Sequence, residues 1–248
     1  MKQLLASTLL ILTSASAMAA DMPIATKAPP RVMAVPYSWT GCYIGIEGGG
    51  AWGRSRHISG DPATLNLNIT NNYDVSGWLI GGEAGCNYQV DRFVFGVEGD
   101  WSWTDKSGSA NDIAPFATTS ISGTKEKWIA TARGRVGFLP TEMLLLYVTG
   151  GAAWASVEAS VNATLTGGGV IAETRDRFGW TAGVGGEYAF GGGWSVKAEY
   201  LYVRLDGSQY FNPPPIGFST RNNVPLDNNI VRVGLNYKFG GGPVVAKY

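Results

Sequence analysis

The chain of 248 residues has few charges, one histidine, two cysteines and no apolar run of bilayer length. Charged residues make up 15% of the sequence, whereas a typical soluble domain has about 25%. The 19 basic and 19 acidic residues balance, so the chain lacks the positive field that attracts nucleic acid, and no nucleic-acid partner is predicted. Because a spanning helix needs roughly 20 consecutive apolar residues, the sequence also excludes a helical membrane protein.

His57 is the only histidine, and it lies in a long polar segment. Hydrolytic enzymes usually need a base beside an acid or a nucleophile, and one loop histidine supplies no such set. The sequence therefore predicts no enzyme, no cofactor and no metal site. We expect His57 to be an exposed loop residue; the alternative is haem binding together with Tyr73 or Tyr210.

The first residues have the order of a secretory signal peptide. Lys2 precedes an apolar run at 4–12, and a series of small residues ends at Ala19. We predict a signal peptide at 1–19. The segment 20–38 is proline-rich and aperiodic, which favours a flexible periplasmic leader.

Eight later segments alternate apolar and polar residues with a period of two, which is the pattern of half-buried strands. Short turns at 91–92, 140–141 and 191–193 alternate with long polar connections, as in barrels whose hairpins run between two rims. We therefore predict an all-β fold, an eight-stranded antiparallel up-and-down transmembrane β-barrel with short periplasmic turns and four long extracellular loops. The predicted strands are 39–53, 75–90, 93–103, 126–138, 143–161, 177–190, 194–205 and 229–239, and the predicted loops are 54–74, 104–125, 162–176 and 206–227.

The last predicted strand carries a family resemblance. Arg232, Gly234, Tyr237 and Phe239 look like the polar, glycine, aromatic and terminal-aromatic positions of the signal that outer-membrane barrels present to their insertion machinery. The resemblance implies that this strand is recognised during insertion into the membrane.

Three further segments, 39–45, 147–151 and 197–202, resemble the small outer-membrane barrels of alpha-proteobacteria. These are the porin-family or outer-membrane immunogenic proteins, with an OmpA-like barrel domain. The resemblance covers 39–239 and implies a location in the cell outer membrane, with outer-membrane lipid, the barrel-insertion machinery and periplasmic chaperones as partners. The chain departs from the family at Cys42, where an aromatic residue is usual, and in a C-terminal tail at 240–248.

The signal, the eight strands and the alternating connections lead to our functional hypothesis. The chain is a structural barrel of the Gram-negative cell envelope that displays its loops at the surface. The alternatives are a narrow-pore porin and a haem- or ligand-binding surface protein, and a soluble lipocalin-like barrel, with its apolar residues inside, is a further reading. The sequence defines no oligomeric state.

Charged residues fall on the inward parity of the predicted strands. The interior of an eight-stranded barrel is only wide enough for side chains to fill, so desolvated charges there must pair. We predict an ion-pair network that plugs the lumen and is anchored by Arg133 and Arg135, which share one strand face; a narrow conduction path is the alternative. The predicted network consists of Glu47, Glu83, Glu98, Asp100, Arg133, Arg135, Glu187, Lys197, Glu199, Arg232 and Lys238.

Aromatic residues gather near the ends of the predicted strands. Interfacial girdles explain this distribution better than carbohydrate stacking does. The residues expected in the girdles are Trp39, Tyr43, Trp52, Trp78, Trp101, Trp103, Trp128, Trp154, Trp180, Trp194 and Tyr237.

Cys42 and Cys86 are the only cysteines, in a chain predicted to enter an oxidising compartment where disulfides persist. If Gly53 pairs with Val75 across the first loop, the antiparallel register places the two cysteines directly opposite each other with the same outward parity. Directly opposed Cα atoms are about 4.5 to 5.5 Å apart, within the range of a disulfide. We predict a disulfide that staples the first hairpin at the periplasmic rim; two small apolar residues facing lipid are the alternative.

Overall fold

The computed structural model describes residues 37–60, 67–116, 118–164, 169–211 and 222–239. The predicted signal peptide, all but the last two residues of the predicted leader, and the C-terminal tail lie outside the described residues. Within the described ranges, no helix is long and apolar enough to cross a membrane.

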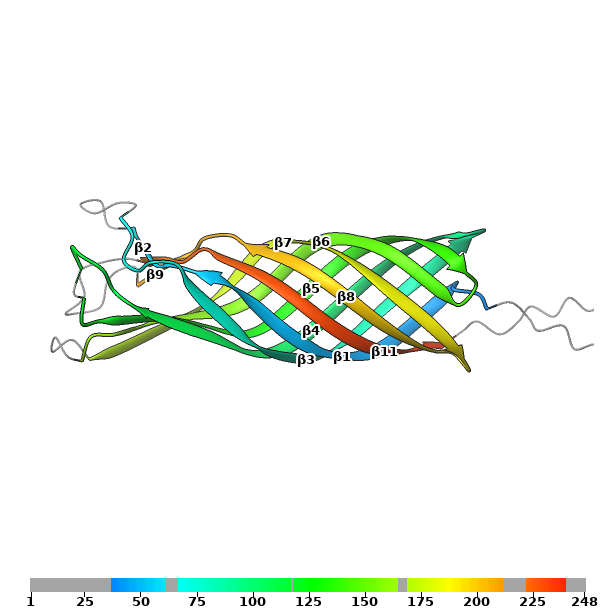
Figure 1. Ribbon diagram of the computed structural model, residues 1–248, viewed down its shortest axis with the longest axis horizontal. Helices are drawn as coiled ribbons and strands as arrows, with labels where there is room; N and C mark the ends of the chain where they lie inside the picture. Colours follow the sequence, from blue (N-terminus) through cyan, green and yellow to red (C-terminus); the bar gives the residue numbers. More distant parts are fainter. Residues whose placement is uncertain (1–36, 61–66, 117, 165–168, 212–221, 240–248) are drawn as a thin grey trace, which may run out of the picture. The chain divides into compact units, whose positions relative to one another are not determined.

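Eight long strands close into a ring in which all neighbouring strands are antiparallel (Figure 1). Because β1 pairs with β11 as well as with β3, the ring has no open edge. The predicted eight-stranded up-and-down barrel is confirmed. In ring order, the strands are β1 (Gly41–Ser55), β11 (Leu226–Phe239), β8 (Trp194–Leu205), β7 (Val170–Gly191), β6 (Leu144–Asn162), β5 (Ile121–Thr141), β4 (Phe93–Asn111) and β3 (Tyr73–Val90).

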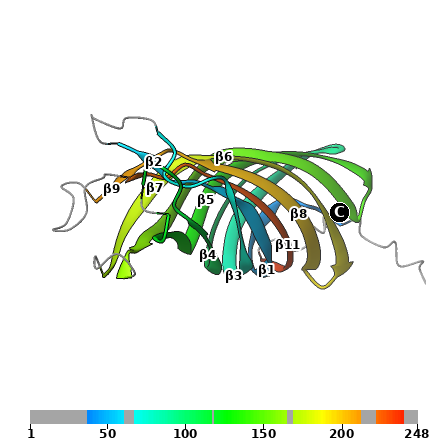
Figure 2. The ribbon, with the colours of Figure 1, turned by 60° about the vertical axis from the view of Figure 1, so that its left-hand side comes forward.

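A second, smaller sheet consists of three two-residue strands from the long connections. These are β2 (Ile58–Ser59), β10 (Asn222–Asn223) and β9 (Gln209–Tyr210), hydrogen-bonded in that order. Figure 2 shows β2 and β9 together at one end of the barrel, which we call the loop end. The opposite end carries the tight turns between consecutive long strands and is called the turn end.

The outward residues of each long strand are apolar over about 9 to 11 residues, the length with which a tilted strand crosses a bilayer. On β4 this stretch runs from Phe93 to Trp103, and the next outward residue is Asp105. The outward residues change from apolar to polar in the same way on the other long strands, so the apolar stretches form one continuous band around the barrel. Aromatic residues that end the band on the loop side are Trp52, Trp78, Trp103, Trp128, Trp154 and Trp180, and charged outward residues beyond it are Arg54, Asp74, Asp105, Lys127, Asp176, Arg204 and Asp227.

Several strands run further toward the loop end than the sequence predicts. The predicted loop at 104–125 is wrong in large part, because β4 continues to Asn111 and β5 already begins at Ile121. The predicted loop at 162–176 is also too long, since β7 begins at Val170. Beyond the apolar band the outward residues are polar, so the alternation that identifies a strand disappears while the backbone pairing continues.

Two smaller expectations about turns and aromatic residues are also corrected. The turn expected at 140–141 lies at 142–143. Trp39 and Tyr43 do not belong to an interfacial girdle, because both are buried inside the barrel. Trp39 precedes β1 and folds into the turn end, where its indole Nε1 donates to the Glu142 carbonyl over 3.0 Å and its backbone N donates to Gln89 Oε1 over 2.8 Å.

The register of the first hairpin places its two cysteines together. Gly53 is paired with Val75, and Cys42 is paired with Cys86, as the sequence predicts. The two sulfurs are bonded, so the structure contains the predicted disulfide. On its other side, Cys42 pairs with Phe239 of β11, which puts the disulfide beside the strand pair that closes the ring.

We predict that Cys42→Ser lowers the free energy of unfolding in detergent micelles by about 2 to 4 kcal/mol. The physical reason is that the disulfide joins residues 44 positions apart and thereby restricts the unfolded chain. Guanidinium unfolding measures the loss. Cys86→Ser and the double variant are the controls, and both should match Cys42→Ser because all three lack the same bond. Equal stability of the wild type with and without reductant would contradict this role.

Candidate functional site in the barrel lumen

The inward side chains of the described residues fall into four layers along the barrel. From the turn end to the loop end, we name them the mouth, the lumen network, the apolar layer and the cap. Strand geometry sets their order, because inward residues on one strand follow each other at every second position. On β11, Asn236, Arg232 and Ile230 succeed one another toward the loop end.

The mouth is an apolar cluster that surrounds Trp39, which is 2% exposed. Tyr37 packs against this cluster, and its ring meets the Trp39 ring edge-on with the centroids 5.1 Å apart. Burial and, to a lesser extent, the nearby charge of Glu187 raise the pKa of Tyr37 to about 12. The other members of the mouth are Val94, Leu139, Leu145, Tyr147 and Ala189.

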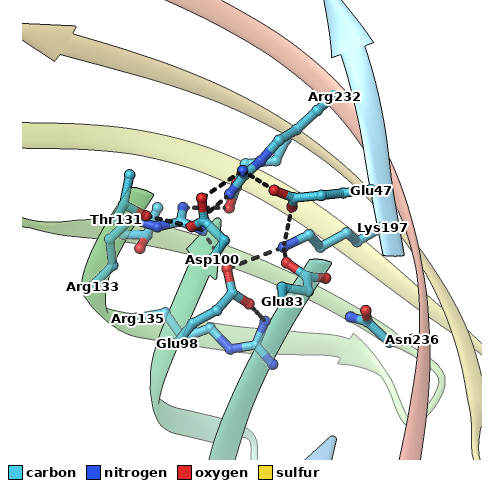
Figure 3. A network of polar contacts seen from close by, with 12 residues as sticks. Glu47, Glu83, Glu98, Asp100, Thr131, Arg133, Arg135, Lys197, Arg232 and Asn236 are labelled. Carbon is cyan, nitrogen blue, oxygen red and sulfur yellow. Dashed lines mark hydrogen bonds and ion pairs between the residues drawn. The ribbon is translucent and has the colours of Figure 1, made fainter. Parts of the chain in front are cut away.

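The lumen network contains ten of the eleven charged residues that the sequence places inside the barrel (Figure 3). None of these residues is more than 7% exposed. Seven of the eight long strands contribute, and β6 adds the Tyr147 hydroxyl, which donates to Glu199 Oε1 over 3.0 Å. The ten residues are Glu47, Glu83, Glu98, Asp100, Arg133, Arg135, Glu187, Lys197, Glu199 and Arg232.

Arg133 joins carboxylates from two strands. Its Nη2 contacts Glu98 Oε1 and lies 3.0 Å from Asp100 Oδ2, while its Nη1 lies 2.9 Å from Glu199 Oε1. Arg232 approaches from the opposite wall and lies 3.0 Å from Asp100 Oδ1 and 2.8 Å from Glu199 Oε2. Asp100 and Glu199 are therefore each held by two guanidiniums.

Arg135 occupies the side of the network nearest the mouth. Its Nη1 lies 3.1 Å from Glu187 Oε2 and 3.4 Å from Glu98 Oε2. Its guanidinium carbon also lies 4.9 Å from the centroid of the Tyr43 ring and 5.2 Å from that of Tyr147. Two aromatic rings and two carboxylates thus surround a single cation.

Lys197 is fully buried and contacts three carboxylates. Its Nζ donates to Glu83 Oε2 and, over 3.0 Å, to Glu98 Oε1, and it lies 3.9 Å from Glu47 Oε2. The other oxygen of Glu47 accepts from Ser102 Oγ over 3.0 Å and contacts Arg232.

Lys238 does not join the network, although its parity on β11 is the predicted one. It lies at the turn end, where its Nζ donates to the Ser38 carbonyl and stands 4.3 Å from the centroid of the Tyr37 ring. Parity fixes the face of the strand but not the level along the barrel axis. At its level Lys238 is only partly buried, so this ammonium needs no buried carboxylate.

The apolar layer and a second buried ion pair were not predicted from the sequence. The layer contains Ala51, Tyr73, Val75, Leu79, Ile129, Ala153, Ala155, Val157, Leu201, Val203, Leu205, Leu226 and Ile230. Next to it, Lys106 Nζ donates to Glu126 Oε2 over 2.9 Å and also to the side chain of Asn228, and all three residues are buried. Extending β4 through the polar segment would have placed Lys106 inward, but the alternation of β5 places Glu126 on the same parity as the outward Trp128. Glu126 faces inward because a β-bulge between Glu126 and Trp128 shifts the parity of β5.

The cap is the polar cluster of His57, Thr70, Asp112 and Thr124 at the loop end. It buries His57, so the expectation of an exposed loop histidine is wrong. The imidazole Nε2 lies 3.3 Å from Thr124 Oγ1, and the backbone N of His57 donates to Thr70 Oγ1 over 3.0 Å. Burial lowers the pKa of His57 to about 4. The side chain is covered because the extension of β5 supplies Thr124, and because the chain folds back so that Ile69 N donates to the His57 carbonyl over 2.8 Å.

The two tyrosines that were considered as haem ligands lie in different surroundings. The Tyr73 ring centroid is 6.2 Å from that of His57, and the Tyr73 hydroxyl is 2.6 Å from Thr124 Oγ1. Tyr210 instead belongs to a separate apolar cluster with Phe211 and donates to the Val157 carbonyl over 3.0 Å. The structure thus brings Tyr73, but not Tyr210, into the same polar cluster as His57.

Glycines make room for the large inward side chains. A Cβ atom at Gly85 would lie 2.6 Å from Tyr43 Cζ, a separation that real Cβ atoms essentially never show. At Gly185 a Cβ atom would lie 2.5 Å from Tyr147 Cζ. Part of the glycine content is therefore a consequence of packing Tyr43 and Tyr147 into a narrow barrel.

The residues that resemble the insertion signal are divided between the two faces of β11. Arg232 belongs to the lumen network and Gly234 also faces inward, whereas Tyr237 and Phe239 face outward. The Tyr237 ring packs against Trp194 with the centroids 5.0 Å apart. The two outward aromatics therefore extend the apolar band to the turn end of the last strand.

The lumen brings charges of opposite sign into contact and holds them away from water. Among the described residues, no three His, Cys, Asp or Glu side chains are grouped so as to hold a metal ion. Several buried atoms of the lumen network, including Glu47 Oε2, Glu83 Oε1 and Arg135 Nη2, have no hydrogen-bond partner among the described residues, and the same is true of Asn236 Oδ1 beside it.

Comparison with known proteins gives a consistent picture. The sequence matches the family model described as outer membrane protein beta-barrel domain over residues 6–239. It is 34% identical over 254 residues to the 31 kDa outer-membrane immunogenic protein of Brucella melitensis, covering 96% of this chain and 100% of the relative. It is 30% identical over 231 residues to the 25 kDa outer-membrane immunogenic protein of Brucella canis, covering 91% of this chain and 92% of the relative.

Two solved structures share the barrel fold. The outer membrane protein OprG from Pseudomonas aeruginosa superposes with a TM-score of 0.50 at 15% identity, covering 84% of this chain and 100% of OprG. The outer membrane protease OmpT from Escherichia coli superposes with a TM-score of 0.51 at 11% identity, covering 84% of this chain and 99% of OmpT. At these identities the likeness shows the fold alone.

We predict that Arg133→Ala lowers the free energy of unfolding by about 3 to 5 kcal/mol, because it leaves buried carboxylates without their partner. Arg204→Ala is the matched control. Its ion pair with Asp227 spans 3.8 Å and is largely exposed, so the loss should stay below about 1 kcal/mol. Chemical unfolding in micelles measures both. Unchanged stability of Arg133→Ala would mean that water fills the lumen and would favour the conduction alternative.

A second prediction concerns the pH dependence of the cap. His57 has a pKa of about 4 in the closed cap and about 6.5 once exposed, so the open form binds a proton that the closed form does not. The free energy of opening the cap is therefore greatest above about pH 6.5. It falls by up to about 1.4 kcal/mol per pH unit as the pH decreases toward 4. Hydrogen exchange at the Ile69 amide, corrected for its intrinsic pH dependence, measures this loss.

His57→Gln is the control for the cap. Burial raises the pKa of the cap carboxyl of Asp112, so this group titrates in the opposite sense, and His57→Gln should retain only that opposite trend. Equal corrected protection of the wild type at pH 7 and pH 4.5 would refute the role of His57.

Proposed function

Because this chain belongs to the outer membrane protein β-barrel domain family, we propose that it is a structural barrel of the Gram-negative cell envelope that displays surface loops. The relatives are named as outer-membrane proteins, and the chain is an outer-membrane protein with them. In this setting the loop end faces the outside of the cell and the turn end faces the periplasm.

The observation that carries the proposal is the occupied lumen. Large buried side chains from seven of the eight long strands form the lumen network, β6 adds the Tyr147 hydroxyl, and the apolar layer follows toward the loop end. Porins that conduct solutes leave a channel by using about 16 to 18 strands. An eight-stranded barrel that places its interior charges in mutual contact supports a structural role better than a transport role.

Surface display is supported by the relatives and by the architecture. Two relatives are named immunogenic outer-membrane proteins, a name that describes proteins reached by an immune response. In this chain, β4 to β7 continue past the apolar band, so the loop-end connections stand clear of the membrane surface. We propose that these connections are the antigenic part of this protein as well.

The lipid of the outer membrane surrounds the apolar band. The barrel-insertion machinery and periplasmic chaperones are proposed as further partners, on the basis of the outward Tyr237 and Phe239 at the end of the last strand. The signal peptide at 1–19, the leader at 20–38, the barrel at 39–239 and the tail at 240–248 remain our proposed organisation of the chain.

We further propose that the protein has no enzymatic activity. The proteolytic activity named for OmpT belongs to that protein, whose resemblance to this chain is one of fold. The histidine of this chain is buried and hydrogen-bonded inside the cap, where a substrate would not reach it without opening of the cap. The names of the relatives also refer to immunogenic membrane proteins and to no catalytic activity.

We predict that the purified protein gives no stepwise ion conductance in planar lipid bilayers, because the network and the apolar layer occupy the lumen. A general porin, reconstituted in parallel, is the positive control. Reproducible conductance steps from this barrel would contradict the proposal and favour the narrow-pore alternative.

Haem titration addresses the second alternative. We expect the absorption spectrum of added haem to remain that of free haem in the presence of the wild type and of His57→Ala alike. A shifted haem band with the wild type that is lost in His57→Ala would establish a haem-binding cap.

A further inference from the structure

The lumen network contains more carboxylates than cations. Glu47, Glu83, Glu98, Asp100, Glu187 and Glu199 face only Arg133, Arg135, Lys197 and Arg232, and all ten are buried. Lys238 could have reduced the difference, but it lies at the turn end with its amine on the Ser38 carbonyl. With every group in its usual ionised form, the network would carry two uncompensated negative charges.

The neighbouring layers do not supply the missing charge. Lys106 pairs with Glu126, so this pair is neutral as a whole. Arg177 is buried at the level of the apolar layer, opposite Ala155, and its guanidinium donates to the Asp206 carbonyl. The excess therefore belongs to the lumen network itself.

The contacts of each carboxylate show where the excess lies. Asp100 and Glu199 each contact two guanidiniums, and Glu98 contacts Arg133, Arg135 and Lys197. Glu187 contacts Arg135 and accepts hydrogen bonds from Ser195 Oγ over 2.6 Å and Asn236 Nδ2 over 3.1 Å. Of the cations, Glu83 contacts Lys197 alone and Glu47 contacts Lys197 and Arg232. Unlike the other four, each of these two carboxylates has one buried oxygen without a hydrogen bond from a described residue.

Glu47 and Glu83 share the single ammonium of Lys197, which lies between them in Figure 3. Glu83 has no other cation within 4 Å among the described residues, and Glu47 has Arg232 in addition. One oxygen of each carboxylate, Glu47 Oε2 and Glu83 Oε1, is buried and accepts no hydrogen bond from a described residue. Glu83 Oε1 faces the backbone of β11 at Gly234, where an added Cβ would approach it to 3.3 Å.

The elements around this pair bring further charges of both signs. Lys197 comes from β8 and Arg232 from β11, while β4 contributes the negative charges of Glu98 and Asp100 together with the Ser102 hydroxyl. Buried water can satisfy the free hydrogen-bonding atoms of the network, but it does not remove a net charge. Leaving uncompensated charges in a narrow desolvated interior is strongly unfavourable.

We propose that the folded barrel binds monovalent cations at Glu47 Oε2 and at Glu83 Oε1, either protons or alkali ions. A divalent metal is disfavoured, because the described residues contain no group of three acidic, histidine or cysteine ligands in reach of one ion. The site is independent of surface display, and its consequence is that uptake of up to two cations accompanies folding of the barrel.

The test is the stability of the full-length protein in detergent between pH 7 and 8.5. His57 is uncharged in the folded chain and mostly uncharged in the unfolded chain in this window, and its small contribution has the opposite sign because its pKa is lowered on folding. If the cations are protons, the carboxylates of the unfolded chain are ionised in this window, so unfolding releases the protons. The unfolding equilibrium constant then rises about tenfold per pH unit for each proton released. If the cations are alkali ions, replacing choline chloride by sodium or potassium chloride at constant ionic strength stabilises the barrel. The stability of the barrel should then depend little on pH.

Glu83→Gln removes one excess charge while keeping the shape of the side chain. If protons are bound, we expect Glu83→Gln to release one proton fewer on unfolding than the wild type, so that its unfolding equilibrium constant depends less steeply on pH. If alkali ions are bound, we expect the variant to lose the stabilisation that the ion at Glu83 gives. In both cases it should be at least as stable as the wild type at pH 8.5. Glu199→Gln is the matched control, because it removes a carboxylate that two guanidiniums already neutralise, and it should be less stable than the wild type.

Two results would overturn the site. One is wild-type stability that changes neither with pH nor on exchange of choline for alkali ions, a result that does not depend on any variant folding. The other is a loss of stability in Glu83→Gln as large as that in Glu199→Gln.

Discussion

The narrow interior of an eight-stranded barrel is the constraint on which the rest of this structure depends. Closing eight strands leaves room for side chains and little else. Every inward residue must therefore contact residues from the opposite wall, and an inward charge must find its partner there. Arg232 of β11 reaches Asp100 of β4 across the lumen in this way. Inward glycines such as Gly85 and Gly185 compensate for the space that Tyr43 and Tyr147 take.

The same constraint explains why the lumen is layered. Charges are stabilised where several partners converge, so they collect at one level, and the levels above and below are closed by apolar side chains or by Trp39. Outside, the apolar band lies against lipid and leaves no place for charge. Apolar and polar residues therefore alternate along each strand because one face of the strand contacts lipid and the other faces a desolvated ionic core.

Much of this arrangement could be predicted from the sequence, because a period of two fixes which residues face inward. The sequence also predicts the register of the first hairpin, in which Cys42 is paired with Cys86. The level of a residue along the axis is not contained in the period, which is why Lys238 was expected in the network. Where both faces of a strand are polar, as on β4 beyond Trp103, the pattern does not distinguish a strand from a loop. The burial of His57 and of Lys106 was missed for that reason. The burial of Glu126 was missed because a β-bulge between Glu126 and Trp128 shifts the parity of β5.

The most direct test of a lumen filled by its own side chains compares two neighbouring positions of β6. Ala153 faces inward and is 0% exposed, whereas Ala152 faces outward within the apolar band. Each is replaced by cysteine in a background in which Cys42 and Cys86 are serine, and the folded protein in lipid vesicles is treated with a water-soluble maleimide. The account predicts that neither thiol reacts until the barrel is unfolded, and that only a probe attached at position 152 before refolding is quenched by brominated lipid. Rapid reaction of the thiol at position 153 in the folded protein would show a water-filled lumen and contradict the account.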